Sequence, residues 1–399
     1  MSSDKKNQIN EVLARGVEHV YPDTKALEAA LRLGKKLRIY AGFDPTGKLH
    51  IGHGVIFLKL RQLQDLGHDI IVLEGDFTAK IGDPTGKLSA RRQLTSAQVK
   101  QNATGYQKLV GKILDLKKSN VRFLHNDDWT SKLKPADLLE LASNFTVARL
   151  LERDMFQARI KAGKDIHVHE FLYPIFQAYD AVAMEVDLQV GGSDQTFNML
   201  AGRTLMRKLK GKEKFVLTMK LLEDPNGKKM GKSEGNMVNL DDEPADIYGK
   251  VMSWPDGVIG AGFEIVTDVP WAEVEAVKKD LKAGKNPKVL KMLLAYSIVK
   301  LYHGTTAAIA AEERFKQVFE EKLNPDEMPV FKTKARTIID VLVATKLASS
   351  KSEARRLVAQ GGVRVDTKVV KDETFVIGPI DRDGVVIQKG KRHFAKVIW

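Results

Sequence analysis

Runs rich in β-branched residues alternate with helical hydrophobic periodicity through the first half of the chain, and this alternation restricts its fold more than any other feature. Residues 37–43 and 69–73 resemble buried strands, and the apolar positions of residues 51–66 between them recur at helical spacing. The pattern predicts βαβ units around a parallel sheet, an α/β fold. Further strands are expected at residues 121–124, 188–190 and 215–221, and further helices at 95–116, 169–187 and 194–208.

The pattern changes after Leu222, which indicates more than one domain. Residues 223–239 are polar and rich in glycine, as mobile loops are, and residues 241–331 have mostly helical character. Residues 325–334 resemble a linker, and two short amphipathic helices are expected within 335–360, followed by short strands. The expected domains are residues 1–222, 223–331 and 332–399.

Charge is concentrated near the end of the chain. The 399 residues carry a net charge of +13, and 15 basic and 7 acidic residues between 332 and 399 supply +8 of it. Such a segment favours a polyanion partner, first of all nucleic acid, although a solubilising surface has the same composition. The sequence has no cysteine, no apolar run of membrane-spanning length and no secretory signal in residues 1–10, so a cytoplasmic protein without a membrane partner is expected.

The string Asp-Pro-Thr-Gly-Lys-Leu-His-Ile-Gly-His-Gly at residues 44–54 lies between the first expected strand and its helix. An open parallel sheet binds ligands there, and a helix N-terminus with two imidazoles suits a phosphate. Gly52 and Gly54 would leave room for a purine or a ribose. The histidines alone could equally be helix caps or half of a metal site, but no completing acidic or thiolate ligand is near in the sequence.

A second basic string, Gly-Lys-Lys-Met-Gly-Lys-Ser at residues 227–233, follows the last expected strand of the sheet. Lysines on a glycine-rich backbone can close over a triphosphate, although most such loops are solvated surface. A separate group, His167, His169 and Glu170, is better explained as a helix start than as a metal cluster.

The two strings together resemble the HIGH and KMSKS signatures of class I aminoacyl-tRNA synthetases, with Gly231 at the middle position of the second. The strings at 40–46, 81–87, 173–180 and 189–195 are similar to those of tyrosyl-tRNA synthetases, and residues 346–363 resemble the S-four RNA-binding domain of the bacterial enzymes. The resemblance implies a Rossmann-like catalytic domain, an α-helical domain and a small α+β RNA-binding domain. It also implies a tyrosine–tRNA ligase that uses ATP with Mg²⁺ carried on the nucleotide, holds no tightly bound metal of its own and acts as a homodimer on tRNA(Tyr).

Residue roles follow from the resemblance, position by position. It assigns catalytic contacts with the triphosphate and the leaving pyrophosphate to Thr46, His50, His53, Lys87, Arg91, Lys229 and Lys232. It assigns the binding of tyrosine to Tyr40, Asp83, Tyr173, Gln177, Asp180 and Gln195, with Asn126 supporting Asp180. It assigns the binding of ATP to Asp44, Gly52, His53, Gly192, Asp194, Lys232 and Ser233. It assigns RNA contacts to Lys351, Arg355, Arg356 and Arg364.

Three alternatives remain open at this point. The Pro-Thr-Gly-x-Leu-His wording also resembles tryptophanyl enzymes, and the segment from Thr46 to His50 is one residue shorter than in many tyrosyl enzymes. An RNA-binding protein derived from a synthetase would use the basic segment without catalysis. A nucleotidyltransferase acting on another carboxylate would not need that segment.

Overall fold

The computed structural model describes residues 3–85, 93–223, 237–319, 328–378, 384–390 and 393–398. The chain divides into two compact units, the first formed by Met1–Glu243 and Lys250–Gly304 and the second by Pro244–Gly249 and Thr305–Trp399. The division into three domains at residues 222 and 331 stays a prediction.

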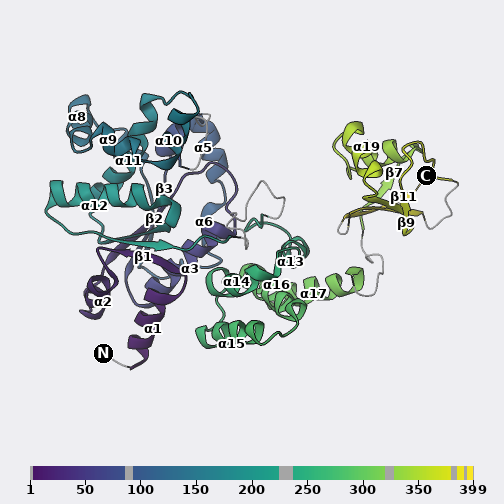
Figure 1. Cartoon of the computed structure of the whole chain (residues 1–399), viewed down its shortest axis with the longest axis horizontal. Coiled ribbons are helices and arrows are strands. Elements are labelled where there is room, and N and C mark those ends of the chain that lie inside the picture. Colours follow the sequence, from purple (N-terminus) through teal and green to yellow (C-terminus); the bar gives the residue numbers. More distant parts are fainter. Residues whose placement is uncertain are drawn as a thin grey trace. The chain divides into compact units, whose positions relative to one another are not determined.

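The first unit is built on a six-stranded sheet with the order β1-β6-β5-β2-β3-β4 (Figure 1). Five strands are parallel, which confirms the α/β class, but β1 pairs antiparallel with β6 at one edge. The strand expected at residues 37–43 was predicted to be the first of the sheet. In the structure it is the second strand along the chain, because the N-terminal segment forms an additional edge strand. The strands are β1 (Val17–Tyr21), β2 (Arg38–Phe43), β3 (Asp69–Glu74), β4 (Val121–His125), β5 (Leu188–Gly192) and β6 (Phe215–Met219).

The strand order reverses between β2 and β5, and this places the functional end of the sheet. From β2 the chain passes through α3 (Ile51–Asp65) to β3 on one side, whereas from β5 it passes through α12 (Thr196–Lys210) to β6 on the other. Figure 1 shows α11 (Val168–Ala183) and α12 on one face of the sheet and α1 (Ser3–Ala14) and α3 on the opposite face. A crevice therefore opens at the carboxyl ends of β2 and β5.

Several expected helices are confirmed with altered ends. The predicted capping box of Thr95 and Gln98 is present, but the helix expected to reach about residue 116 stops at Ala103, because Gly105 takes a left-handed conformation with φ +86°. The helix expected at 169–187 ends at Ala183, and the one expected at 194–208 begins with a short 3₁₀ turn. The remaining helices of this sheet region are α2 (Thr24–Arg32), α4 (Thr78–Ile81), α5 (Ser96–Ala103), α6 (Tyr106–Val110), α7 (Asp127–Thr130), α8 (Pro135–Ser143), α9 (Val147–Leu151) and α10 (Asp154–Lys161).

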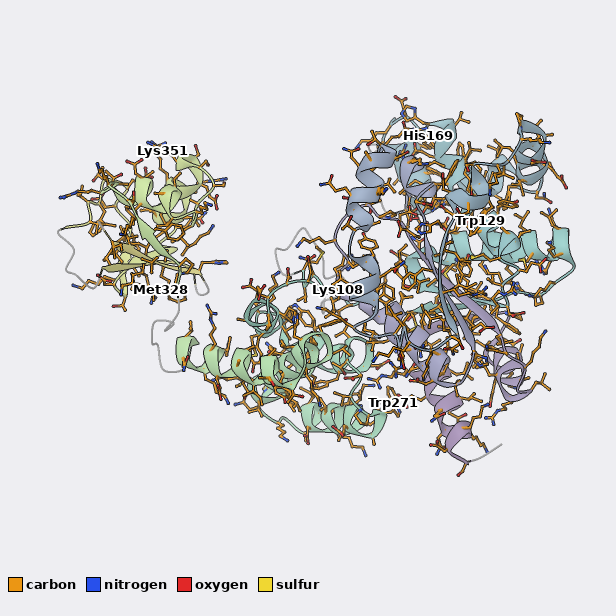
Figure 2. The ribbon with its side chains drawn as sticks, turned by 180° about the vertical axis from the view of Figure 1, so that it is seen from behind. Lys108, Trp129, His169, Trp271, Met328 and Lys351 are labelled. Carbon is orange, nitrogen blue, oxygen red and sulfur yellow. The ribbon has the colours of Figure 1, made fainter. Side chains whose placement is uncertain are left out.

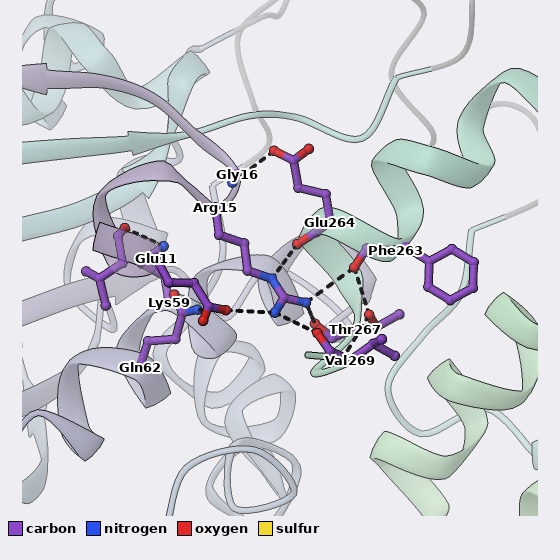
Figure 3. Close-up of polar contacts among 10 residues, drawn as sticks. Glu11, Arg15, Gly16, Lys59, Gln62, Phe263, Glu264, Thr267 and Val269 are labelled. Atoms are coloured by element: carbon purple, nitrogen blue, oxygen red, sulfur yellow. Dashed lines mark hydrogen bonds and ion pairs between the residues drawn. The ribbon is translucent and has the colours of Figure 1, made fainter. Parts of the chain in front are cut away.

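The predicted helical segment follows residue 243. It consists of α13 (Pro244–Met252), α14 (Ile259–Val266), α15 (Trp271–Lys282), α16 (Pro287–His303) and α17 (Thr305–Phe319). In the first unit, the Arg15 guanidinium donates to the carbonyl oxygens of Phe263, Glu264, Thr267 and Val269 at the C-terminal end of α14 (Figure 3). These carbonyls have no partner within the helix, so Arg15 fastens α14 to the segment between α1 and β1.

In the second unit, the residues after 328 form a sheet with the order β7-β11-β10-β8-β9 and two helices. The two helices expected within residues 335–360 are confirmed. The linker expected at 325–334 is wrong in part, because residues 330–332 form β7, which pairs parallel with β11. The elements are β7 (Val330–Lys332), α18 (Ile338–Ala344), α19 (Lys351–Ala359), β8 (Val363–Val365), β9 (Lys368–Val370), β10 (Val385–Lys389) and β11 (His393–Ile398).

Among the residues that the structure describes, no helix combines the length and the apolar character needed to cross a bilayer.

Candidate active site

A cavity of about 550 Å³ opens at the carboxyl ends of β2 and β5. Its volume suits a small-molecule ligand, and it lies where the strand order reverses. The predicted residues Lys87, Arg91, Lys229, Lys232 and Ser233 lie outside the described residues. The predicted residues that line the cavity are Tyr40, Asp44, Thr46, His50, Gly52, His53, Asp83, Asn126, Tyr173, Gln177, Asp180, Gly192, Asp194 and Gln195.

One end of the cavity is formed by a tyrosine hydroxyl and a carboxylate. Tyr40 on β2 is fully buried, and its hydroxyl has no hydrogen-bond partner among the described residues. Burial and then the charge of Asp180 raise the pKa of Tyr40 well above 10.0, so the hydroxyl stays protonated. A buried hydroxyl without a partner costs free energy, and this cost would be recovered by a ligand with a polar group at that place.

Asp180 on α11 is held by two donors. Trp129 Nε1 donates to Oδ1 at 2.9 Å and Asn126 Nδ2 donates to Oδ2 at 3.3 Å, so the predicted support from Asn126 is present. Burial raises the pKa of Asp180 to about 8, although the hydrogen bonds from Trp129 and Asn126 act against the rise. Trp129, labelled in Figure 2, was not anticipated from the sequence.

Asp44 lies at the centre of the polar wall, directly after β2. Its Oδ2 accepts from the Tyr173 hydroxyl at 2.9 Å and its Oδ1 from Thr78 Oγ1 at 2.7 Å. Gly75 makes this approach possible, because a Cβ atom there would lie 2.2 Å from the Asp44 carboxylate. Asn126 Nδ2 also donates to Thr78 Oγ1. A continuous set of hydrogen bonds therefore connects Asp44 with Asp180.

A second acidic group in the cavity is already oriented. Gln195 Nε2 donates to Asp83 Oδ2 at 2.8 Å, and the Thr85 backbone N–H donates to Asp83 Oδ1 at 2.9 Å. Gln177 Oε1 is buried without a hydrogen-bond partner among the described residues. An oriented carboxylate and an unpartnered amide oxygen in one cavity are suited to an ammonium group.

The two histidines of the 44–54 string cap α3. His50 Nδ1 accepts from the Gly52 N–H at 3.2 Å, and His53 Nδ1 accepts from the His50 N–H at 3.1 Å. Because each Nδ1 is an acceptor, the hydrogen of each neutral ring is on Nε2, which is therefore a donor. The interpretation of Gly54 as space for a nucleotide is wrong, because a Cβ there would lie 2.2 Å from the Tyr302 hydroxyl of α16.

The described residues on both sides of the predicted phosphate loop belong to the cavity. Leu222 and Met237 line it. Beyond Met237 the chain is fixed to the histidine turn, because the Ile51 N–H donates to the Val238 oxygen and the Leu240 N–H donates to the Leu49 oxygen, both at 2.9 Å. The chain directly after the predicted loop is therefore anchored beside the histidine turn, and Leu222 before the loop lines the same cavity.

Two polar residues of the site, Thr78 and Trp129, carried no signal in the sequence. They belong to short helices after β3 and β4. Their side chains join the site only through the register of neighbouring strands, which a single sequence does not specify. The strings at residues 40–46 and 173–180 indicated that Asp44 has partners in the site. They did not show which residues these partners are.

The comparisons with known proteins agree with this geometry. Residues 32–320 match the model of the class I tRNA synthetases (W and Y), and residues 319–397 match the C-terminal domain of tyrosine–tRNA ligases. The chain therefore belongs to the class I tRNA synthetase family and, within it, to the tyrosine–tRNA ligases.

The similarity to relatives extends over nearly the whole chain. The tyrosine–tRNA ligase of Thermotoga maritima is 43% identical over 392 residues, which cover 97% of this chain and 96% of that protein. The one from Carboxydothermus hydrogenoformans is 40% identical over 412 residues and covers both chains completely. Among solved structures, a C-terminally truncated mitochondrial tyrosyl-tRNA synthetase of Aspergillus nidulans has a TM-score of 0.65 and 26% identity, over 78% of this chain and 94% of that chain.

Proposed function

We propose that this chain activates L-tyrosine with ATP and then transfers the tyrosyl group to the 3′-terminal adenosine of tRNA(Tyr). In the first step a carboxylate oxygen of tyrosine attacks the α-phosphorus of ATP, and the bond to pyrophosphate breaks to leave tyrosyl-adenylate. In the second step a ribose hydroxyl of the tRNA attacks the tyrosyl carbonyl and releases AMP. No covalent bond to the protein is needed, so the residues act by positioning and by charge stabilisation.

The observation that carries this proposal is the buried pair of Tyr40 and Asp180 in the cavity. A phenol between them would satisfy the unpartnered Tyr40 hydroxyl and donate to an oxygen of Asp180. Tyr173, Gln177 and Asp83 would then surround the ammonium group of the amino acid. Phenylalanine would leave both buried polar groups without a partner, which is the physical basis for rejecting it.

ATP would bind at the opposite end of the cavity, against the N-terminus of α3. The Nε2 donors of His50 and His53 and the positive end of the helix favour phosphate oxygens. Thr46, Asp44, Gly52, Gly192 and Asp194 would contact the nucleotide. For Lys87, Arg91, Lys229, Lys232 and Ser233 the proposed contacts with phosphate rest on the sequence strings alone.

Magnesium is proposed to arrive bound to the nucleotide, where phosphate oxygens supply the hard ligands that it prefers. Its chemistry would be the neutralisation of charge on the leaving pyrophosphate. Among the described residues, one group of three metal-ligating side chains lies close together, Glu74, Asp76 and His125, and none of the three lines the cavity. We place the reaction in the cytoplasm, as is usual for translation enzymes of this family.

Exchange of radiolabelled pyrophosphate into ATP in the presence of each amino acid tests the proposal. We expect exchange with tyrosine and little or none with phenylalanine or tryptophan. Exchange that prefers tryptophan would support the tryptophanyl alternative, and tight RNA binding without any exchange would support an RNA-binding protein. Aminoacylation of purified tRNA(Tyr) with labelled tyrosine tests the second step.

The second unit is proposed to bind the tRNA. Arg355 and Arg356 on α19 and Arg364 on β8 are exposed, and Lys351 is exposed while it pairs with Asp340 at 2.8 Å. Figure 2 shows Lys351 at the edge of this part of the chain. Exposed cations on an element of a basic domain are suited to phosphates, and each such contact contributes to the salt dependence of binding.

The double variant Arg355→Ala/Arg356→Ala is expected to weaken tRNA(Tyr) binding and to lower the slope of log K against log salt by about 2, because two phosphate contacts are lost. Filter binding at several salt concentrations measures both quantities. The matched variant Lys35→Ala/Lys36→Ala removes two exposed lysines of the first unit and should change neither. An unchanged slope for the arginine variant would exclude these residues as phosphate contacts.

A homodimer is proposed through α8–α11, which Figure 1 shows together at one end of the first unit. Four apolar side chains on these consecutive helices are exposed: Leu139 (72%), Val147 (66%), Ile160 (49%) and Val168 (78%). Exposed apolar side chains on consecutive helices are typical of a protein interface, and the family resemblance names a second copy as the occupant.

The variant Ile160→Asp/Val168→Asp is expected to convert the dimer to a monomer, because burying two carboxylates in an apolar interface costs more than a moderate dimer gains. Light scattering coupled to gel filtration gives the mass directly. Leu33→Asp is the control, since Leu33 is 82% exposed at the end of α2, away from these helices. A dimeric double variant would place the interface elsewhere.

A further inference from the structure

Arg153 is a buried arginine that the reaction described above does not use. It lies directly before α10, is 7% exposed, and does not line the cavity. Its Nη2 donates to Thr85 Oγ1 at 2.7 Å. The Cζ atom of the guanidinium is 5.6 Å from the centre of the Phe156 ring and 5.0 Å from the centre of the Phe197 ring. The guanidinium therefore contacts two aromatic rings and one hydroxyl.

The position of this guanidinium is costly, which indicates a specific use. Its Nη1 is buried without a hydrogen-bond partner among the described residues, and desolvating a charged donor without a partner costs free energy. An apolar side chain of similar length would avoid that cost. Arg153 adds two things over such a side chain: a donor to Thr85, and a positive charge near the Asp83 carboxylate, whose Oδ1 is 3.9 Å from Nη2.

Thr85 connects Arg153 with Asp83. A guanidinium can only donate hydrogen bonds and a carboxylate can only accept them, so the Thr85 hydroxyl accepts from Arg153 and donates to Asp83 Oδ1 at 2.6 Å. Hydrogen bonds that follow one another in this way polarise and strengthen each other. The Thr85 backbone N–H donates to the same oxygen at 2.9 Å.

The second oxygen of Asp83 is held from the start of α12. Gln195 Nε2 donates to Oδ2 at 2.8 Å, and Asn198 Nδ2 donates to Gln195 Oε1 at 2.8 Å. A carboxylate has about four accepting positions, and these contacts with Thr85 and Gln195 use three of them. Asp83 lines the cavity, so a position is left for a donor bound there. A carboxylate that is already oriented loses less freedom when that donor binds.

We infer that Arg153 and Thr85 are positioning residues that hold the Asp83 carboxylate in the orientation in which it receives the ammonium group of the substrate. Neither of the two lines the cavity, so they act on the amino acid through Asp83. This inference rests on the proposed function, because it takes an amino acid as the substrate. It predicts that both residues matter for ligands that carry an ammonium group and not for the binding of a phenol.

Tyramine and 4-ethylphenol are the probes, used as inhibitors of tyrosine-dependent pyrophosphate exchange, because they share the phenol and differ in the ammonium group. The variant Arg153→Met keeps an unbranched side chain that can pack against Phe156 and Phe197. We expect it to weaken inhibition by tyramine about tenfold, since a hydrogen bond to a charged group is worth about that factor. Inhibition by 4-ethylphenol should not change. The KM for tyrosine should rise by a similar factor, and the KM for ATP should stay that of the parent.

Thr85→Val is the second variant, because it keeps the branched shape and replaces the hydroxyl by a methyl group. The same selective loss of tyramine inhibition is expected from it. Thr85→Ser keeps the hydroxyl and should retain the values of the parent. Arg32→Met is the matched control for Arg153→Met, since Arg32 pairs with Glu28 on the same helix, α2. Its two inhibition constants should equal those of the parent.

Failure of this inference can be told apart from failure of the proposed function. If the parent chain shows no tyrosine-dependent exchange, the proposed function fails. If the parent is active and either variant folds with the parent's ratio of the two inhibition constants, the inference is overturned. That includes the case in which both inhibitors weaken alike, because Arg153 would then only support the shape of the cavity. Should Arg153→Met not fold, Thr85→Val decides, because the Thr85 side chain is half-buried and uncharged.

Discussion

Asp180→Ala should lower kcat/KM for tyrosine in pyrophosphate exchange by a factor of about 30 or more. The carboxylate is 2% exposed and is the proposed acceptor for the substrate phenol. Its removal also leaves Trp129 Nε1 and Asn126 Nδ2 without the acceptor that they have now. Leaving a buried donor or acceptor without its partner typically costs about 1–3 kcal/mol, and 2 kcal/mol corresponds to about 30-fold.

The same variant should lose little activity toward phenylalanine, because phenylalanine makes no hydrogen bond to Asp180. The control is Asp128→Ala, which removes an exposed carboxylate one residue before Trp129. We expect parent kinetics from it. A variant at Asp180 that still prefers tyrosine as strongly as the parent would show that the phenol binds elsewhere in the cavity.

Glu170→Ala should destabilise the first unit by about 3–5 kcal/mol. Arg159 on α10 is fully buried, and its guanidinium donates to both carboxylate oxygens of Glu170 on α11 at 2.6 Å. Among the described residues, removing the carboxylate leaves the buried cation with the Asp165 carbonyl oxygen as its hydrogen-bond acceptor. Breaking a buried ion pair on one side is strongly destabilising for this reason. Urea denaturation followed by circular dichroism gives the free energy of unfolding.

Acidification should weaken the same pair. Burial acts to raise the pKa of Glu170, but the hydrogen bonds from Arg159 outweigh it and hold the pKa below the ordinary value of 4.5. The stabilisation is therefore present above pH 4.5 and is lost as the pH falls through the lower pKa of the folded chain.

Asp280→Ala, which breaks an exposed pair with Lys285, is the control for Glu170→Ala and should cost less than about 1 kcal/mol. If Glu170→Ala and Asp280→Ala lowered the free energy of unfolding by similar amounts, burial would not explain the cost of removing the Glu170 carboxylate.

Local sequence was sufficient where an element carries its own signal. The capping box of Thr95 and Gln98 and the start of α11 at His167 were predictable because the interacting groups are three residues apart. The strand–turn–helix at residues 38–65 was predictable from periodicity alone. These elements place Asp44, His50 and His53 at the mouth of the cavity without further information.

Contacts between distant segments were not predictable in the same way. Gly54 gave the same local signal as Gly52, yet it faces Tyr302 of α16, more than two hundred residues later in the sequence. The edge strand β1 was missed because its partner is β6, at the far end of the same sheet. Lys214 has no local signal for burial, and only the register of β2, β5 and β6 places it next to the Tyr40 ring.

The contacts of Arg15 bear on where the chain can be shortened for expression. Its guanidinium donates to the buried C-terminal end of α14, and Lys59 of α3 donates to the Val12 oxygen at 2.6 Å. Residues 3–15 therefore brace both α14 and α3, the helix whose start binds the nucleotide in the proposed reaction. Removing the segment up to and including Arg15 from an expression clone would leave these four carbonyl oxygens without the Arg15 donor. The segment before β1 therefore helps to hold the first unit together.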